Sequence, residues 1–151
     1  MLEIRPDDPA APHVAELLAF HIGEVQGAMG AHAHALDAGG LSMPGVSFWT
    51  AWSGDELAGF AGLKRIDAHA CEVKSMRASP SARGTGVGRA LMEHLIAEAR
   101  AGGYRTLYLE TGTTKMHEPA VRLYRKAGFA ECEAFADYTP SPLNLFMRLA
   151  L

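Results

Sequence analysis

The most distinctive chemistry lies between Ser81 and Arg89, where the sequence is Ser-Ala-Arg-Gly-Thr-Gly-Val-Gly-Arg. Three glycines at alternate positions let the backbone turn tightly and approach a ligand closely. The segment precedes an expected amphipathic helix, whose first amides have no intrahelical acceptor and sit at the positive end of the helix dipole. A phosphate or a pyrophosphate is the natural ligand of such a place. Arg83 and Arg89 flank it and could add charge-assisted contacts.

Four interpretations of this loop are open. A nucleotide P-loop would need a Gly-Lys pair, which the chain lacks. A dinucleotide fingerprint on Gly84 and Gly86 would have Arg89 in place of its third small residue, although Glu110 follows at a suitable distance. The other two interpretations are a plain connecting turn and a coenzyme A pyrophosphate site. The two arginines and the strict glycine alternation count against the plain connecting turn.

Hydrophobic periodicity and turn residues predict the elements that must position the loop. We expect helices over Pro9–Met29, Gly84–Ala101 and Glu118–Lys126, and strands over Leu2–Arg5, Val46–Trp52, Leu57–Ile66, His69–Ala78, Tyr104–Glu110, Phe129–Phe135 and Asn144–Leu149. Gly30–Gly45 is expected to be a loop with one helical turn. The order predicts an α+β chain around a mixed sheet. No repeat or linker interrupts it, so we expect one domain over residues 1–151.

Composition and charge exclude several classes of protein. The net charge is −3, whereas nucleic-acid binders are usually basic, so we expect no nucleic-acid partner. Met1–Asp8 lacks the apolar stretch of a signal peptide, and no run approaches the roughly 18 apolar residues of a membrane span. Cys71 and Cys132 match no metal or redox motif, and His32 with His34 offers too few ligands for zinc. We therefore expect a cytoplasmic protein with no membrane partner and no metal.

Two motifs carry a resemblance to a known family. Arg83-Gly84-Thr85-Gly86-Val87-Gly88 resembles the Arg/Gln-x-x-Gly-x-Gly/Ala signature of the GNAT N-acetyltransferase superfamily. Ala120–Phe129 is similar to the family's Ala-x-x-Leu-Tyr-x-x-x-Gly-Phe element, and Lys74–Ala78 precedes the loop in the same order. The resemblance covers nearly the whole chain. Glu72–Arg77, Leu109–Gly112 and the tail from Asp137 to Met147 look like a bacterial subgroup of small-molecule acetyltransferases.

The resemblance implies a three-layer α/β/α fold with a splayed mixed sheet, in which acetyl-CoA, as co-substrate, fills the gap. The strand edge at Met76 and Ala78 would then pair with the pantetheine and thioester, as in strand addition. The cofactor-binding residues that it implies are Met76, Arg77, Ala78, Arg83, Gly84, Thr85, Gly86, Val87, Gly88, Arg89 and Tyr124. The family's asparagine at the start of the last helix is missing here, because Met116–Pro119 occupies that region.

The implied reaction moves an acetyl group directly onto the primary amine of a small molecule. An ammonium must first lose a proton, and Glu72 is the candidate base. Glu110 is the rival base or a ligand of the substrate amine, Tyr124 is the acid that protonates the leaving thiolate, and His34 would line the acceptor pocket. The alternatives are a protein or peptide N-acetyltransferase and a non-catalytic acetyl-CoA sensor, while Arg89 disfavours a nicotinamide enzyme. The C-terminal strand is a candidate homodimer edge.

Overall fold

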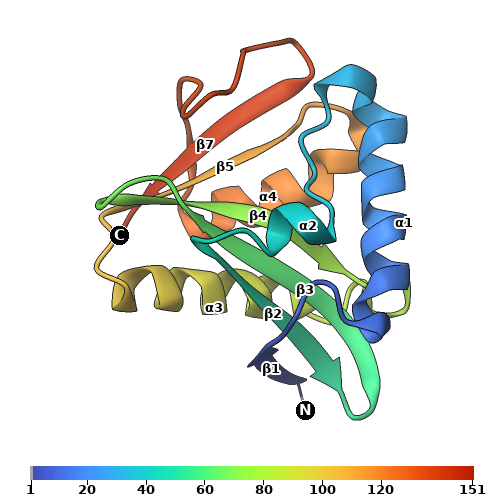
Figure 1. Cartoon of the computed structure of the whole chain (residues 1–151). Helices are drawn as coiled ribbons and strands as arrows, with labels where there is room; N and C mark the ends of the chain where they lie inside the picture. Colours follow the sequence, from blue (N-terminus) through green and yellow to red (C-terminus); the bar gives the residue numbers. More distant parts are fainter. Residues whose placement is uncertain (1) are drawn as a thin grey trace.

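The computed structural model describes residues 2–151 (Figure 1). The helices and strands of this part of the chain, in order, are β1 Leu2–Pro6, α1 Pro12–Met29, η1 Gly30–His32, α2 Ala38–Leu41, β2 Val46–Ser53, β3 Glu56–Arg65, β4 Ala70–Ala78, η2 Pro80–Ala82, α3 Val87–Ala101, β5 Thr106–Gly112, η3 Lys115–His117, α4 Glu118–Ala127, β6 Ala130–Glu131 and β7 Asn144–Ala150. Apart from shifts of a few residues at their ends, most elements lie where the periodicity predicts them.

The strands form one mixed sheet in the order β1-β2-β3-β4-β5-β7-β6. Neighbouring strands run antiparallel, except β4 and β5, which are parallel and connected through α3. A parallel connection needs a crossover of this kind, because the chain must return to the same end of the sheet. The predicted α+β arrangement around a mixed sheet is confirmed.

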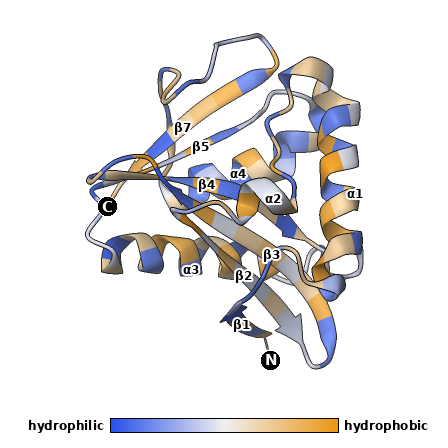
Figure 2. Cartoon of the chain, in the orientation of Figure 1, coloured by the Kyte–Doolittle hydropathy of each residue, from blue (hydrophilic) through white to orange (hydrophobic). Residues whose placement is uncertain are grey.

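Helices cover both faces of the sheet and give three layers (Figure 1). The larger hydrophobic core packs α3 and α4 on one face, with Leu91 and Leu95 fully buried. The smaller core packs α1 and α2 on the other face through Val14, Leu41 and Phe60. Apolar and polar residues alternate along α1 and α3, as expected of helices with one buried side (Figure 2). Within residues 2–151, none of the helices combines the length and the apolar character that a bilayer crossing requires.

The start of α3 differs from the prediction for a conformational reason. The helix begins at Val87 rather than at Gly84. Gly84 and Gly86 have φ angles of 77° and 88°, which lie outside the helical region. The glycine segment is therefore a loop that leads into the helix rather than its first turn.

The strand predicted at Phe129–Phe135 is largely wrong. Only β6 pairs with β7, and Phe135 instead packs its ring against those of Tyr108 and Phe146, at centroid distances of 4.7 and 5.8 Å. After β6 the Cys132 amide donates one more backbone hydrogen bond, to the Phe146 carbonyl at 2.8 Å, and the regular pairing then ends. β6 pairs with only Met147 and Arg148 of β7, so part of the outer side of β7 has no partner strand among residues 2–151.

Candidate active site

A cavity opens where β4 and β5 separate. Their parallel pairing covers only three residue pairs, Ala70–Glu72 against Thr106–Tyr108. Beyond these pairs the strands diverge toward α1 (Figure 1), and a cavity of about 690 Å³ lies between them. Its walls come from α1, residues 34–35, β4, the glycine loop (residues 83–89), β5, η3 and α4. This volume lies within the range of small-molecule sites.

β4 is irregular where it borders this cavity. Its ladder with β3 shifts register between Phe60 and Gly62. Ser75, at this shift, has a φ of 57°, a left-handed conformation that residues with a side chain rarely adopt. The Ser75 hydroxyl is buried and finds no hydrogen-bond partner among residues 2–151. Backbone strain of this kind concentrates at functional sites.

The glycine loop, residues 83–89, forms the wall of the cavity at the start of α3. Gly84, Gly86 and Gly88 line it together with Val87. Gly86 caps the helix in a left-handed conformation, and no side chain caps the first turn. The amides of that turn are therefore free for a ligand, which suits an anion.

The two arginines of the loop, Arg83 and Arg89, line the cavity and are exposed. The Arg83 guanidinium lies 3.4 Å from the Glu24 carboxylate, and that of Arg89 lies 2.9 Å from Glu93. Their side chains are 57% and 78% exposed, so neither pair holds its arginine tightly. Thr85 is the one predicted cofactor residue that does not line the cavity; its hydroxyl donates to the carbonyl of Ala82.

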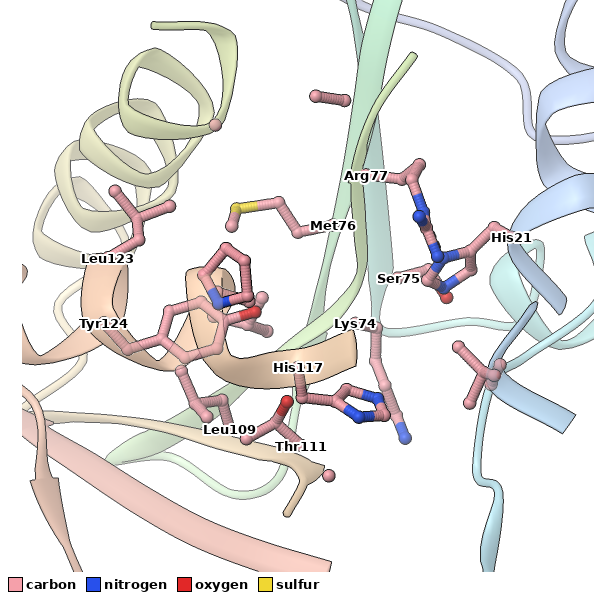
Figure 3. A pocket seen from close by; sticks show the side chains of 18 of the residues that line it. His21, Lys74, Ser75, Met76, Arg77, Leu109, Thr111, His117, Leu123 and Tyr124 are labelled. Atoms are coloured by element: carbon pink, nitrogen blue, oxygen red, sulfur yellow. Dashed lines mark hydrogen bonds between the residues drawn. The ribbon is translucent and has the colours of Figure 1, made fainter. Parts of the chain in front are cut away.

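Side chains on β4 leave the strand in different directions (Figure 3). Met76 points toward α4, whereas Arg77 turns to α1, where its Nε donates to His21 Nδ1 at 2.9 Å and a terminal nitrogen bonds Glu24 at 2.7 Å. Burial lowers the pKa of His21 to about 3, with a further contribution from Arg77, so the ring is neutral and can accept. Arg77 and Ala78 line the cavity, and the Arg77 side chain joins β4 to α1.

Glu72, the predicted base, belongs to a buried ion pair. Its carboxylate lies 3.3 Å from Lys74 Nζ, with side-chain exposures of 3% and 9%. The Tyr138 hydroxyl donates to the same Glu72 oxygen and accepts from Lys74. Burial and the Glu72 charge raise the pKa of Tyr138. Glu72 lines the cavity, but one of its oxygens is already occupied by two donors.

Glu110, the predicted rival, also lines the cavity and carries one hydrogen bond, from Asn144 Nδ2 at 2.9 Å. Burial raises the pKa of Glu110 to about 7, against the lowering effects of the Asn144 bond and the Lys74 charge. A carboxyl group that titrates near neutrality can both take and release a proton under physiological conditions.

Tyr124 lies on α4, on the side of the cavity toward which Met76 points from β4 (Figure 3). It is 7% exposed, and burial raises its pKa to about 12. The phenol therefore stays protonated at neutral pH and can serve as a proton donor. Leu123 beside it contributes an apolar contact to the same wall.

Two histidines line the remaining walls. His34 lies edge-on to Tyr138, with 4.9 Å between the ring centroids, and burial lowers its pKa. His117, in η3, replaces the family's asparagine region; its Nδ1 lies 2.8 Å from the Thr114 hydroxyl, and burial lowers its pKa too. A Cβ on Gly112 would come within 2.4 Å of the His117 ring, so glycine is required beside it.

Several polar residues of the cavity were not predicted, namely His21, Lys74, His117, Tyr138 and, beside the lining, Asn144. For Lys74 the sequence does carry a signal, because its alternation with Glu72 places both on one strand face, and the two form an ion pair. The others depend on contacts between distant segments. Among residues 2–151, no three His, Cys, Asp or Glu side chains gather closely enough to hold a metal ion.

Comparisons with known proteins were consistent with one another. The model of the acetyltransferase (GNAT) family matches residues 30–129. YsnE of Bacillus subtilis, an uncharacterized N-acetyltransferase, is 47% identical over 118 residues, which cover 78% of this chain and 78% of that protein. YedL of Escherichia coli, also an uncharacterized N-acetyltransferase, is 40% identical over 152 residues, covering 100% of this chain and 96% of that protein. A solved structure from Klebsiella pneumoniae, whose name describes an acyl-CoA N-acyltransferase, matches with a TM-score of 0.83 at 27% identity, over 100% of this chain and 98% of that chain.

Proposed function

Since the chain belongs to the acetyltransferase (GNAT) family, we propose that it transfers the acetyl group of acetyl-CoA to the primary amine of a small molecule. The predicted superfamily, acyl-CoA N-acyltransferase fold and N-acetyltransferase class are confirmed. Acetyl-CoA is the acetyl donor of this family. The acceptor class and the role of each residue are the proposal.

The donor is proposed to bind along β4 and the glycine loop. The unpaired edge of β4 beyond Glu72 offers backbone groups at Met76 and Ala78 to an extended pantetheine arm. The free amides at the start of α3 suit its pyrophosphate, and Arg83 and Arg89 can turn to it because both are exposed. The residues present therefore fit the donor.

Glu110, rather than Glu72, is proposed as the general base. Glu72 is held by Lys74 and Tyr138, whereas Glu110 has a single donor and a pKa of about 7. An acceptor ammonium with a pKa near 10.4 would lose its proton to the Glu110 carboxylate. The resulting amine attacks the thioester carbonyl carbon, the carbon–sulfur bond breaks, and Tyr124 donates its proton to the departing sulfur. The nitrogen loses its second proton as the neutral amide forms, and this proton restores the Tyr124 phenol.

A small acceptor is favoured by the contacts that cover its end of the cavity. The 30–37 segment contacts the chain between β6 and β7 there through the His34–Tyr138 ring contact, and the start of β7 through a hydrogen bond of 3.1 Å from Asn144 to the His32 carbonyl. These contacts leave less room for a polypeptide than an open groove would. The observation that carries the proposal is the parting of β4 and β5, which brings the glycine loop, Glu110 and Tyr124 to one cavity.

The experiment is an acceptor screen that measures free thiol released from acetyl-CoA, combined with calorimetry of coenzyme A binding. We expect turnover with small primary amines and saturable binding of coenzyme A. Turnover on peptides alone would overturn the small-molecule assignment. Failure both to bind coenzyme A and to release thiol with any acceptor would overturn the activity itself.

The acid role has its own test. Tyr124→Phe should lower kcat by about 10²–10⁴-fold, as the loss of a general acid does, and leave the Kd for coenzyme A unchanged. Tyr108→Phe is the matched control, because Tyr108 lies on β5 but outside the cavity lining. An unchanged kcat in Tyr124→Phe would remove this tyrosine from the mechanism.

A further inference from the structure

Asn144 lies at the first position of β7, outside the cavity lining but in contact with Glu110. In the β5–β7 ladder it stands opposite Gly112, while Glu110 stands opposite Phe146, so Asn144 and Glu110 are diagonal neighbours. Diagonal neighbours on one face of a sheet are within reach of each other's side chains. Asn144 is only 8% exposed, and a buried amide of this kind needs its hydrogen-bonding groups to be satisfied.

Each polar atom of the Asn144 side chain has a partner. Nδ2 donates to Glu110 Oε2 at 2.9 Å and to the His32 carbonyl at 3.1 Å, and Oδ1 accepts from the Ser141 hydroxyl. A carboxylate oxygen and a carbonyl are both acceptors, so both hydrogens of the amide are required. The orientation of the amide group is fixed by these partners.

The backbone around Asn144 is held by hydrogen bonds that do not involve the Asn144 side chain. The Asn144 amide donates to the Ser141 carbonyl at 3.2 Å, the Thr113 amide donates to Leu143 at 3.1 Å, and the Thr113 hydroxyl donates to Pro142 at 2.7 Å. The turn before β7 is thus held to the end of β5. Asn144 is a rigid anchor rather than a mobile contact.

From this geometry we infer that Asn144 is a positioning residue, which orients the Glu110 carboxylate and ties the 30–37 segment to it. The inference rests on the function proposed above, in which Glu110 is the base. With Oε2 engaged, Oε1 is left to face the acceptor amine, and the same amide group holds His32 and therefore the approach to His34. The Asn144 side chain thus connects Glu110, the proposed base, to the 30–37 segment beside the acceptor end of the cavity.

The other charged and titratable groups that interact with Glu110 come from three parts of the chain. Lys74 and Glu72 act on it from β4, and Glu110 in turn raises the pKa of Tyr138 in the β6–β7 connection and of Tyr124 on α4. Of the groups around it, Asn144 and Lys74 favour the ionised form, while burial and Glu72 oppose it. Removing the Asn144 bond should therefore raise the pKa of Glu110.

The test is the pH dependence of kcat/KM for Asn144→Leu, a substitution of similar size without the amide. A hydrogen bond to a charged group corresponds to about one pH unit or more. The acid limb of this profile is the range in which kcat/KM falls at low pH because Glu110 takes up a proton. Its midpoint, near pH 7 in the wild type, should rise by about one pH unit, so kcat/KM at pH 7 should fall about five- to tenfold. We also expect KM for the acceptor to rise, with KM for acetyl-CoA unchanged.

Thr113→Val is the matched control, because it loosens the same turn without touching Asn144 or Glu110. It should leave the pH profile in place. If Asn144→Leu folds poorly, Asn144→Asp provides the second variant: its carboxylate beside Glu110 should move the acid limb upward by more than Asn144→Leu does. An acid limb that stays in place in both variants would overturn the inference.

A second readout separates this inference from the proposed function. Carbon-13 NMR titration of the Glu110 carboxyl group, identified by its loss in Glu110→Gln, needs no acceptor. An upward shift of its midpoint in Asn144→Leu supports the inference even if the wild-type protein releases no thiol. An unshifted midpoint in an otherwise active enzyme would refute the role of Asn144 and leave the proposed function standing.

Discussion

The two sides of the cavity are built by different means. The donor side, residues 76–89, is one continuous stretch that presents backbone groups, and two of its arginines, Arg83 and Arg89, are exposed and loosely paired. The acceptor side consists of buried and half-buried side chains that contact one another through hydrogen bonds and a ring contact, namely His34, Glu72, Lys74, Glu110, Tyr138 and Asn144. The donor side depends on conformation, and the acceptor side depends on charge and hydrogen bonding.

This difference has a consequence for how each side responds to substitution. A backbone site tolerates exposed side-chain changes but not changes in φ. A buried polar network fails when one partner is lost, because the remaining group stays desolvated. Substitutions should therefore separate into those that change donor affinity and those that change turnover, pH dependence and stability.

The largest effect is expected at Glu110. Glu110→Gln should lower kcat/KM at pH 8 by about 10²-fold or more and abolish the acid limb near pH 7, because the base is removed. The variant should also be more stable at pH 8, by about 1–3 kcal/mol. The folded pKa of Glu110 lies above its ordinary value of 4.5, so its ionisation costs stability as pH rises through about 7.

These Glu110 effects are measured by pH–rate profiles and by denaturant unfolding at pH 5 and pH 8. Glu131→Gln, at an exposed position on β6, is the control and should change neither quantity. A full acid limb in Glu110→Gln would show that another group is the base and would return Glu72 to consideration.

Lys74→Met tests whether the buried network supports the acceptor side. It leaves Glu72 buried without its cation, and breaking a buried ion pair from one side costs about 3–5 kcal/mol. Urea unfolding measures the loss. In the double variant Glu72→Gln/Lys74→Met no charge remains unpaired, so the loss should be clearly smaller; an equal or larger loss would contradict the argument.

Gly86→Ala tests the donor side through its backbone. The φ of 88° is unfavourable for alanine by about 1–2 kcal/mol, and relaxation of the loop should raise the Kd for coenzyme A by about tenfold. The acid limb of the pH profile should stay in place. Gly103→Ala is the control, since Gly103 has a similar φ of 80° but lies outside the cavity lining.

Calorimetry and chemical denaturation distinguish the two glycines. Both alanine variants should lose stability, and only Gly86→Ala should lose affinity for coenzyme A. Equal affinities in the two variants would mean that the glycine loop does not hold the donor.

The smallest effect is expected for Arg89→Ala. Its exposed pair with Glu93 contributes less than about 0.5 kcal/mol to the free energy of unfolding. The Kd for coenzyme A should rise a few-fold, and less so at high salt, because an exposed charge is screened. Arg100→Ala, in the last turn of the same helix, should leave this Kd unchanged; a Kd that Arg89→Ala also leaves unchanged would exclude a phosphate contact.

The donor side of the cavity could be predicted from the sequence to a larger extent than the acceptor side. The glycine loop could be predicted because its glycines, arginines and helix start are contiguous, and all its predicted residues except Thr85 line the cavity. Tyr138 reaches Lys74 and Glu72 across more than sixty residues of chain, and Asn144 reaches His32 from still farther. Such pairs depend on how distant segments pack, which a local pattern does not contain. The strand predicted at Phe129–Phe135 was wrong for a related reason, since the ring contacts of Phe135 outweighed its local strand pattern.

The short pairing between β4 and β5 also bears on how the molecule moves. β7 and β5 share a ladder of seven pairs, while only three pairs join this hairpin-like unit to β4. We therefore expect Ala70–Glu72 to act as a hinge, about which the β5–β7 part of the sheet rotates relative to the β1–β4 part. Amide hydrogen exchange should slow at Val73–Ala78 when coenzyme A binds, because a ligand bound between β4 and β5 contacts both parts of the sheet and reduces their relative motion.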